Sequence, residues 1–353
     1  MLVLSFYTLS AQNYKGQHFG IDQIKHDDCL VSIYTGFPSF PIFLVFFQFL
    51  GPVVDKLQYW GSKPNAKKRQ RAKKLTPMDQ LFMTLVKLRL DLKIVDLAFC
   101  FNISTAVVSR YFTTWICFLY HHLKEIDWMP SVKQVEGTLP SAFREKYPST
   151  YCIIDGSEIF METPSDLHMQ SSTWSSYKHH NTAKFLIGCT PNGCVSFISP
   201  LNVGSISDVE LTRVSGLLNC IEDKPGISIM ADRGFTIKDM LDNIGIKLNV
   251  PPFMEGRKQL PASEVTEGRK IASVRIHVER AIGRIKSFQI LKHTIPITLA
   301  GLSNQIVTVC AFLSNFKPVL VPPAEPYSEE FDSNSDVEDY FAELSESEDS
   351  DEQ

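Results

Sequence analysis

The sequence lacks a long apolar run. Its most apolar stretch, residues 41–50, has about ten residues, whereas a helix that crosses a bilayer needs ~20. We therefore interpret it as a buried helix and expect no membrane partner. The N-terminus also lacks a basic region ahead of an apolar core, so a secretory signal is not predicted.

Paired cysteines are missing as well. The eight cysteines of the 353-residue chain are scattered, and no two of them form a CxxC pair. This spacing argues against a disulfide framework or a zinc knuckle and predicts reduced, mostly buried thiols in an intracellular protein. The length is sufficient for two or three domains.

Basic residues are absent from the end of the chain. Thirteen of the 39 acidic residues follow Ala324, where no Lys or Arg occurs, and the preceding residues carry 35 basic against 26 acidic side chains. The formal net charge of -4 therefore combines a basic body with an acidic tail. This distribution predicts a polyanion-binding protein with a disordered, solvated appendage.

A basic run occupies residues 63–74, between two apolar segments. The side chains that we expect to contact DNA here are Lys67, Lys68, Arg69, Arg71, Lys73 and Lys74. The composition fits a solvated connector, a nuclear localisation signal or an arm that grips phosphates, and the last two can coexist.

Three helical patterns follow the basic run. Thr76-Pro77 predicts a helix start, and further helices are expected over about 94–101 and 104–120, with Asn102 able to adopt the left-handed conformation between them. This arrangement is typical of a DNA-binding helix-turn-helix, whose second helix enters the major groove, although any small helical hairpin has the same pattern. The expected DNA-contacting residues of the second helix are Thr105, Ser109 and Arg110.

Two apolar, β-branched runs lead into an aspartate and a glycine. Residues 151–154 precede Asp155-Gly156, and residues 227–231 precede Asp232-Arg-Gly234, which predicts two buried strands that each end in a tight turn. If the strands are adjacent and parallel, both carboxylates emerge at the edge where open α/β sheets place their chemistry.

A third acid, Glu279, lies in the helical pattern of residues 271–286. Cleavage of a phosphodiester by two metal ions ~4 Å apart needs carboxylates to hold Mg²⁺ or Mn²⁺. We predict that Asp155, Asp232 and Glu279 are catalytic and bind two such ions, with Asp155 bridging them. Taken singly, each acid could equally cap a turn or pair with a neighbouring base.

Other charged residues surround these acids in the sequence. Asp208 is expected to cap the helix after it, and Glu158 could lie near the metal ions. Arg275, Arg280, Arg284 and Lys286 are expected to make one side of the helix cationic, and we assign the three arginines to DNA binding, with a solvated face as the alternative. Lys178 and His179 are also predicted to contact DNA, with His179 and His180 pointing to opposite faces of a strand.

The remaining pattern predicts a mixed sheet flanked by helices. Residues 184–190 and 194–199 flank Pro191-Asn192-Gly193, a hairpin signal, and helices are expected near 211–218 and 236–244. This order of elements predicts a mixed α/β layer with helices on both faces.

Taken in order, these motifs resemble the DDE superfamily of transposase-derived endonucleases, in particular its Harbinger-like branch. The motifs are Leu75-Thr-Pro-Met-Asp79, Ile153-Ile-Asp155-Gly-Ser-Glu-Ile-Phe160, Thr173-Trp-Ser-Ser-Tyr-Lys-His-His-Asn-Thr182, Gly204-Ser-Ile-Ser-Asp208, Met230-Ala-Asp232-Arg-Gly-Phe235 and Arg275-Ile-His-Val-Glu279-Arg280. The resemblance covers about residues 28–320. It implies a ribonuclease-H-like fold, a divalent-metal site of the three acids, cleavage and joining at transposon ends, and a nuclear setting.

The predicted organisation follows from these segments. It comprises an undefined N-terminus (1–27), an apolar helical element (28–62), the basic linker (63–74), an all-α helix-turn-helix domain (75–128), a ribonuclease-H-like α/β endonuclease domain (129–320) and the acidic tail (321–353). Double-stranded DNA is the expected partner, with a second copy of the chain and an accessory DNA-binding protein as further candidates. The alternative function is that of a domesticated DNA-binding protein that no longer cuts.

Overall fold

The computed structural model describes residues 19–61, 75–252 and 261–323. The predicted basic linker, with Lys67, Lys68, Arg69, Arg71, Lys73 and Lys74, lies outside the described residues, as does the acidic sequence from residue 324 onward. The predicted segment boundaries at the two ends of the chain therefore stay predictions.

The described chain begins with short helices. They are η1 (Ile21–Gln23), α2 (Asp28–Thr35), α3 (Phe40–Phe49), η2 (Pro52–Lys56), α4 (Pro77–Leu90), α5 (Ile94–Cys100) and α6 (Thr105–Lys124). The apolar run of the sequence forms α3, but only one face of this helix is buried. Phe43 and Phe46 are inaccessible, whereas Val45 and Phe49 are 63% and 50% exposed.

Helices α5 and α6 form the predicted helix-turn-helix. Their axes meet at 104°, within the range of this motif. Asn102, in the turn, has a left-handed φ of 50°, and the side chain of Ser104 accepts a hydrogen bond from the backbone N–H of Val107 at the start of α6. The Thr76 side chain caps α4 in the same way, accepting from the N–H of Asp79. Capping groups at these positions satisfy the free N–H groups of the first helical turn.

A mixed sheet follows the helix-turn-helix. Its strands are β1 (Thr150–Phe160), β2 (Trp174–Ser175), β3 (His180–Cys189), β4 (Val195–Ile198), β5 (Asn202–Val203), β6 (Ser228–Met230) and β7 (Lys247–Asn249). The strand order is β2-β3-β1-β6-β7, with β4 and β5 also paired to β3. Pairing is antiparallel between β1 and β3 and parallel from β1 through β6 to β7. This is the ribonuclease-H-like mixed sheet that was predicted.

The two aspartate-bearing segments are adjacent and parallel. Ile153 of β1 is paired with Met230 of β6, so Asp155 and Asp232 each lie two residues beyond the last paired position. The prediction that both strands end at their aspartate was wrong for β1. That strand continues to Phe160 because its pairing with β3 runs through Gly156 without a break.

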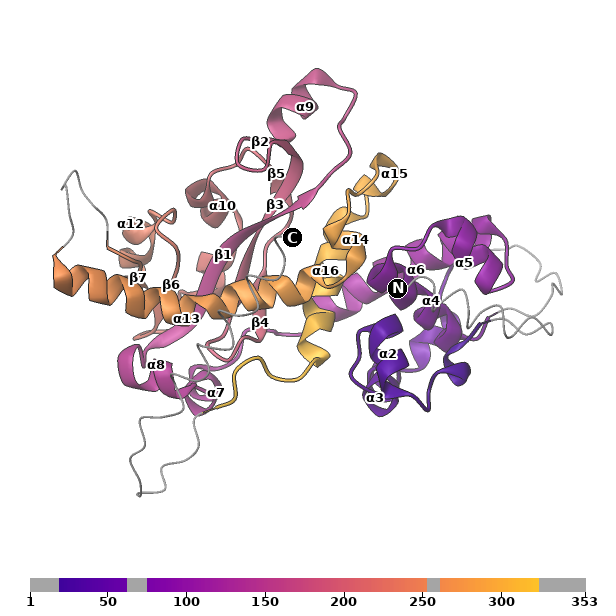
Figure 1. Cartoon of the computed structure of the whole chain (residues 1–353), viewed down its shortest axis with the longest axis horizontal. Coiled ribbons are helices and arrows are strands. Elements are labelled where there is room, and N and C mark those ends of the chain that lie inside the picture. Colours follow the sequence, from indigo (N-terminus) through magenta and orange to yellow (C-terminus); the bar gives the residue numbers. More distant parts are fainter. Residues whose placement is uncertain (1–18, 62–74, 253–260, 324–353) are drawn as a thin grey trace, which may run out of the picture. The chain divides into compact units, whose positions relative to one another are not determined.

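Helices cover both faces of the sheet. The remaining ones are α7 (Val132–Gly137), α8 (Ser141–Lys146), α9 (Leu167–Thr173), α10 (Asp208–Val214), α11 (Leu217–Ile221), α12 (Lys238–Asp242), α13 (Ala262–Lys286), α14 (Gln289–Lys292), α15 (Ile297–Ala300), α16 (Ser303–Leu313) and η3 (Ser314–Phe316). The long helix α13 crosses one face (Figure 1), where Val278 shares a buried cluster with Ile153. On the other face, Leu211 of α10 shares a second cluster with Ile154.

The helix expected near 211–218 is interrupted. Gly216 adopts a left-handed φ of 84° between α10 and α11, a conformation that suits a residue without Cβ.

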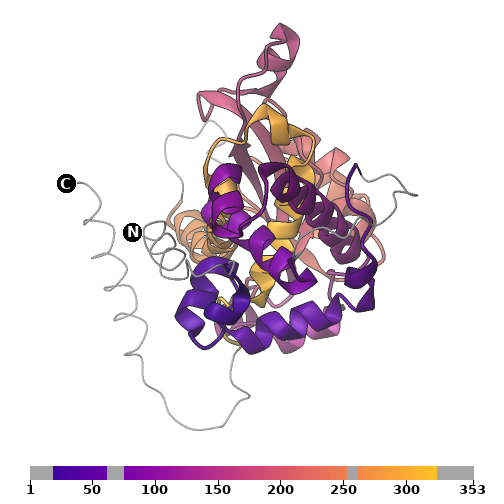
Figure 2. The ribbon, with the colours of Figure 1, turned by 90° about the vertical axis from the view of Figure 1, so that its right-hand side faces the viewer.

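The helix-turn-helix and the sheet share one of these cores. α16 contacts both α6 and β4, and Figure 2 shows it among the N-terminal helices and the sheet. Arg89 of α4 adds a polar link, since its Nη1 donates to the carbonyl oxygen of Ser287, at 2.7 Å, where α13 ends. No single helix of the described parts is long and apolar enough to cross a membrane; two bent pairs of successive helices, α2 with α3 and α5 with α6, reach that threshold only by length and composition.

Candidate active site

Asp155 and Asp232 lie side by side just beyond the last paired residues of the parallel strands β1 and β6, because the segments that carry them are adjacent and in register. Together with Glu279 they form what we call the acidic edge. Neighbouring strands are ~4.8 Å apart. Each aspartate is oriented by the residue after it. The backbone N–H of Gly156 donates to Oδ1 of Asp155 and that of Arg233 donates to Oδ1 of Asp232, both at 2.8 Å.

Helix α13 carries Glu279, and Arg275 of the same helix links Glu279 to Asp232. Nη2 of Arg275 is 3.1 Å from Oε1 of Glu279 and 3.8 Å from Oδ1 of Asp232. The Arg275 side chain is only 17% exposed, whereas those of Asp232 and Glu279 are 49% and 54% exposed. A guanidinium therefore bridges two of the three predicted catalytic acids.

Burial raises the pKa of Asp155 to about 6, from an ordinary value of 3.8. The negative charges of Asp232 and Glu279 act in the same direction, while the Gly156 N–H and the Arg275 charge oppose them. The three acids are thus close enough to influence one another, and Asp155 is the one most removed from water. Acidic groups that repel one another in a partly buried site favour a bound cation.

The donor chemistry of the three carboxylates is that of a hard divalent cation such as Mg²⁺ or Mn²⁺. As they stand, however, no three His, Cys, Asp or Glu side chains in the described parts of the chain are arranged to hold one metal ion. Arg275 supplies positive charge to the acids instead. Gathering the acids around a metal would require Asp232 and Glu279, both about half exposed, to turn away from Arg275.

Two lysines approach the acids from different elements. Burial lowers the pKa of Lys286, at the end of α13, and the charge of Lys178 adds to this effect while those of Glu158 and, less strongly, Asp155 oppose it. Lys178 is exposed in the turn between β2 and β3, where its Nζ lies 4.4 Å from the centre of the Tyr177 ring. Lys286 therefore lies within charge influence of Asp155, and Lys178 lies within charge influence of Lys286.

The expectation for the two histidines was wrong. His179 does not lie on a strand but occupies the same turn, with a left-handed φ of 50°, and only His180 begins β3. The alternation of side chains along a strand therefore does not apply to this pair. His179 is exposed, and its predicted DNA contact stays a prediction.

The expectation of one cationic side on α13 was also wrong. Helical residues are offset by ~100° per position, so Arg275 and Lys286 share the face of Glu279 while Arg280 and Arg284 lie ~100° and ~140° away. Arg284 donates to the carbonyl oxygen of Pro318. Arg280 lies near His277, whose pKa falls to about 4 through burial and this positive charge. Their DNA contacts stay predictions, now on a different surface from the acids.

The expectation that Asp208 caps α10 was wrong. Ser207 is the cap, since its side chain accepts from the N–H of Glu210. The Asp208 carboxylate instead pairs with Lys184 of β3 at 2.9 Å. Sequence reasoning missed Lys184, because nothing along the chain connects the two positions, which only the β3 and α10 contact brings together.

Glu158 faces away from the predicted metal site. Side chains alternate along β1, so Glu158 points to the α10 face and Asp155 to the α13 face. Glu158 accepts a hydrogen bond from Oγ1 of Thr182 at 2.6 Å, which gives it a structural partner there.

The predicted groove-binding residues begin α6. Thr105 and Arg110 are exposed and Ser109 is partly buried. They belong to the helix-turn-helix and are not part of the acidic edge.

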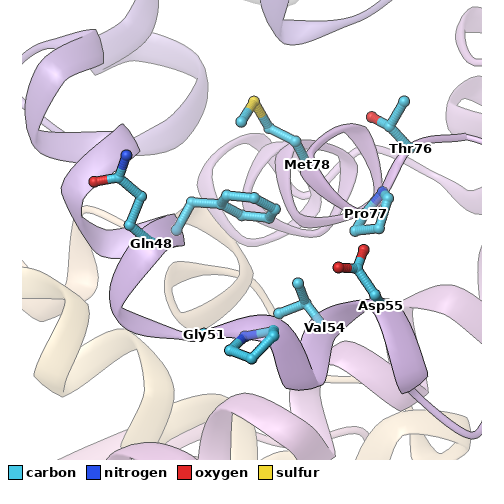
Figure 3. A pocket seen from close by; sticks show the side chains of 9 residues that line it. Gln48, Gly51, Val54, Asp55, Thr76, Pro77 and Met78 are labelled. Carbon is cyan, nitrogen blue, oxygen red and sulfur yellow. The ribbon is translucent and has the colours of Figure 1, made fainter.

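A separate hollow of about 430 Å³ lies between α3, η2 and the start of α4 (Figure 3). Gln48, Val54, Asp55 and Met78 are among its lining residues. None of the residues that line it belongs to the acidic edge, so this hollow is not where the candidate chemistry lies.

This chain combines a ribonuclease-H-like sheet that carries the acidic edge with a helix-turn-helix. That combination is typical of proteins that process nucleic acids. The family model of the DDE superfamily endonuclease matches residues 154–315, and that of the helix-turn-helix of DDE superfamily endonuclease matches residues 73–125. Together the two matches span more than half of the chain, which belongs to the DDE superfamily of endonucleases. No curated protein matches the sequence.

Proposed function

We propose that this chain is a divalent-metal-dependent DNA endonuclease of the transposase type, with Asp155, Asp232 and Glu279 as its metal-binding and catalytic acids. The observation that carries the proposal is the position of two aspartates at the same level of adjacent parallel segments, with Glu279 joined to Asp232 through Arg275. Both family matches support the same class of reaction.

Each acid has a role in this proposal. Asp155, the most buried of the three, would hold the cations together with Asp232 and Glu279, whose negative charges already raise its pKa. When bound, Mg²⁺ or Mn²⁺ would activate the attacking water or 3′-hydroxyl and stabilise the leaving oxygen of the phosphodiester. Arg275, released from its acid partners, would then be available to a DNA phosphate on the same side of α13.

The helix-turn-helix would hold double-stranded DNA, with Thr105, Ser109 and Arg110 toward the major groove. Lys178 and Lys286 would contribute phosphate contacts beside the acids. A nuclear location, Harbinger-like ancestry and joining of DNA ends belong to the same proposal. A second copy of the chain or an accessory DNA-binding protein would be further partners.

A nicking assay on supercoiled DNA with Mn²⁺ tests the proposal. Asp232→Asn removes a metal-binding charge with little change in shape, so we expect metal-dependent nicking to be lost while DNA binding persists. Asp239→Asn is the matched control, because Asp239 is an exposed aspartate on α12 outside the acidic edge, and it should nick as the wild type does.

Two results would contradict the proposal. Equal nicking by the wild type and Asp232→Asn would attribute the activity to something other than these acids. DNA binding by the wild type without any metal-dependent nicking would instead support the domesticated, non-cutting protein.

A further inference from the structure

The Asp208 carboxylate lies between the two segments that carry the candidate catalytic aspartates. Its Oδ1 would be 2.9 Å from a Cβ built on Gly156, and its Oδ2 would be 3.2 Å from a Cβ built on Gly234. These glycines follow Asp155 by one residue and Asp232 by two. Neither has a positive φ, so what favours glycine here is the close approach of Asp208 and, at Gly156, also of Lys184, whose Cε would be 3.2 Å from the Cβ.

Lys184 holds this carboxylate in place. Its Nζ is 2.9 Å from Oδ1 of Asp208 and also donates to the carbonyl oxygen of Ile206 at 3.2 Å. The side chains of Lys184 and Asp208 are 14% and 30% exposed. Ion pairs that are removed from water to this degree hold a more defined geometry than exposed ones, which contribute little.

Asp208 and Lys184 lie on the α10 face of the sheet, opposite the face of the candidate catalytic aspartates. Gly156 faces α10, whose Leu211 clusters with Ile154, whereas Asp155 faces α13, on the side where Ile153 clusters with Val278. Asp208 is therefore placed to support the aspartates from the opposite face of the sheet. It does not share their face.

Backbone pairing does not fix the spacing of these segments. The ladder between β1 and β6 ends at Ile153 and Met230, before either aspartate. Beyond that point, Asp208 contacts the chain on both sides of the gap. We propose that Asp208 and Lys184 are positioning residues that fix the distance between the Asp155 and Asp232 segments, and so adjust the metal site on the other face. The second part of this inference rests on the proposed function.

Hydrogen exchange of the metal-free protein, followed by mass spectrometry, tests the positioning directly. Asp208→Asn and Lys184→Met preserve much of the side-chain size but remove the ion pair. We expect faster exchange in residues 231–236 of both variants, with little change in β7. Leu211→Ala is the control, because it disturbs the core under α10 and leaves the pair intact.

Mn²⁺ titration calorimetry on the same proteins adds a readout that a general loss of stability does not move. Loss of a supporting residue behind metal ligands typically weakens metal binding 10–100-fold, so we expect about tenfold weaker Mn²⁺ binding in Asp208→Asn and Lys184→Met. Leu211→Ala should bind as the wild type does at a temperature where both are folded. Lys184→Arg keeps the positive charge, so it should bind Mn²⁺ more tightly than Lys184→Met does.

The outcomes separate this inference from the proposed function. Unchanged exchange in Asp208→Asn overturns the positioning role, and if Mn²⁺ binding is nevertheless weaker, Asp208 is itself a ligand. Equal effects of Leu211→Ala on exchange and Mn²⁺ binding would also overturn it. Faster exchange at residues 231–236 combined with no Mn²⁺ binding by the wild type would support the positioning role and overturn the metal-dependent nuclease.

Discussion

At the acidic edge, the positive charge of Arg275 partly offsets the repulsion among the three carboxylates. Arg275 lies between Asp232 and Glu279, while Asp155 remains partly out of water with a pKa of about 6. The local N–H donors of Gly156 and Arg233 orient the two aspartates. At this scale the site is charged and compact, and its acids are not yet gathered around one point.

The raised pKa of Asp155 predicts a dependence of stability on pH. The folded state holds the Asp155 proton more tightly than the unfolded state, so this stabilisation is complete below pH ~4 and is lost as the pH rises through about 6. Asp155→Asn mimics the protonated form. In EDTA, we expect it to raise the free energy of unfolding by about 1–3 kcal/mol at pH 8 and to change it little at pH 4.

Urea unfolding at the two pH values measures this difference. Asp239→Asn, at an exposed position on α12, is the control for the replacement of a carboxylate by an amide. A loss of stability in Asp155→Asn at pH 8 would show that attraction to Arg275 outweighs the cost of burying the Asp155 charge.

The two proposed activities, DNA cleavage and DNA binding, belong to different elements. Helix α13 carries Arg275, Glu279 and Lys286 on the face that we propose for cleavage, and the helix-turn-helix carries the residues expected to bind the major groove. The sequence predicted residues 271–286 of α13 because the apolar stripe there has helical spacing, and Ile271, Val274, Val278 and Ile285 are all buried. It did not predict the first turns of the helix, which begins at Ala262. The angular positions of its cations also follow from the sequence at ~100° per residue, and the expectation of one cationic side overlooked this spacing. Only the contact from Arg284 to Pro318 needed the structure.

The first turns of α6 provide the test at this scale. Arg110 is exposed near the start of the helix, so Arg110→Ala should weaken DNA binding and reduce the slope of log affinity against log salt by about one. Lys124→Ala, a cation at the other end of α6, is the matched control and should leave the slope unchanged. Fluorescence anisotropy over a range of salt concentrations measures both. An unaltered slope in Arg110→Ala would remove this residue from the proposed DNA interface.

In the molecule as a whole, the helix-turn-helix and the sheet are not independent. One buried cluster extends from Phe19 through Trp115 of α6 to Leu313 of α16, and Arg89 bonds the end of α13. Elements that share a core in this way are expected to unfold together. The predicted domain boundary between residues 128 and 129 stays a prediction. The shared core contains residues from both sides of it.

Calorimetry of the full chain tests this coupling. We expect a single heat-absorption peak for residues 19–323, because the buried cluster of the helix-turn-helix continues into the α13 face of the sheet. Arg89→Ala should lower the melting temperature of the whole peak by about 3–6 °C, since a buried bond from a charged donor is worth ~2 kcal/mol. Lys93→Ala, in the same region but on the surface before α5, should have little effect. Two separate peaks would contradict the single unit.

The sequence by itself determined the periodic elements, the order of the motifs and which three acids are candidates, because these depend on local spacing and on the chemistry of single residues. Only the tertiary structure decided that β1 passes through Gly156, that Arg275 lies between two acids, and that Asp208 approaches two glycines from the opposite face of the sheet. Those facts depend on strand register and on the angle at which helices cross the sheet. Contacts between residues distant in sequence set both quantities, and no local pattern records them.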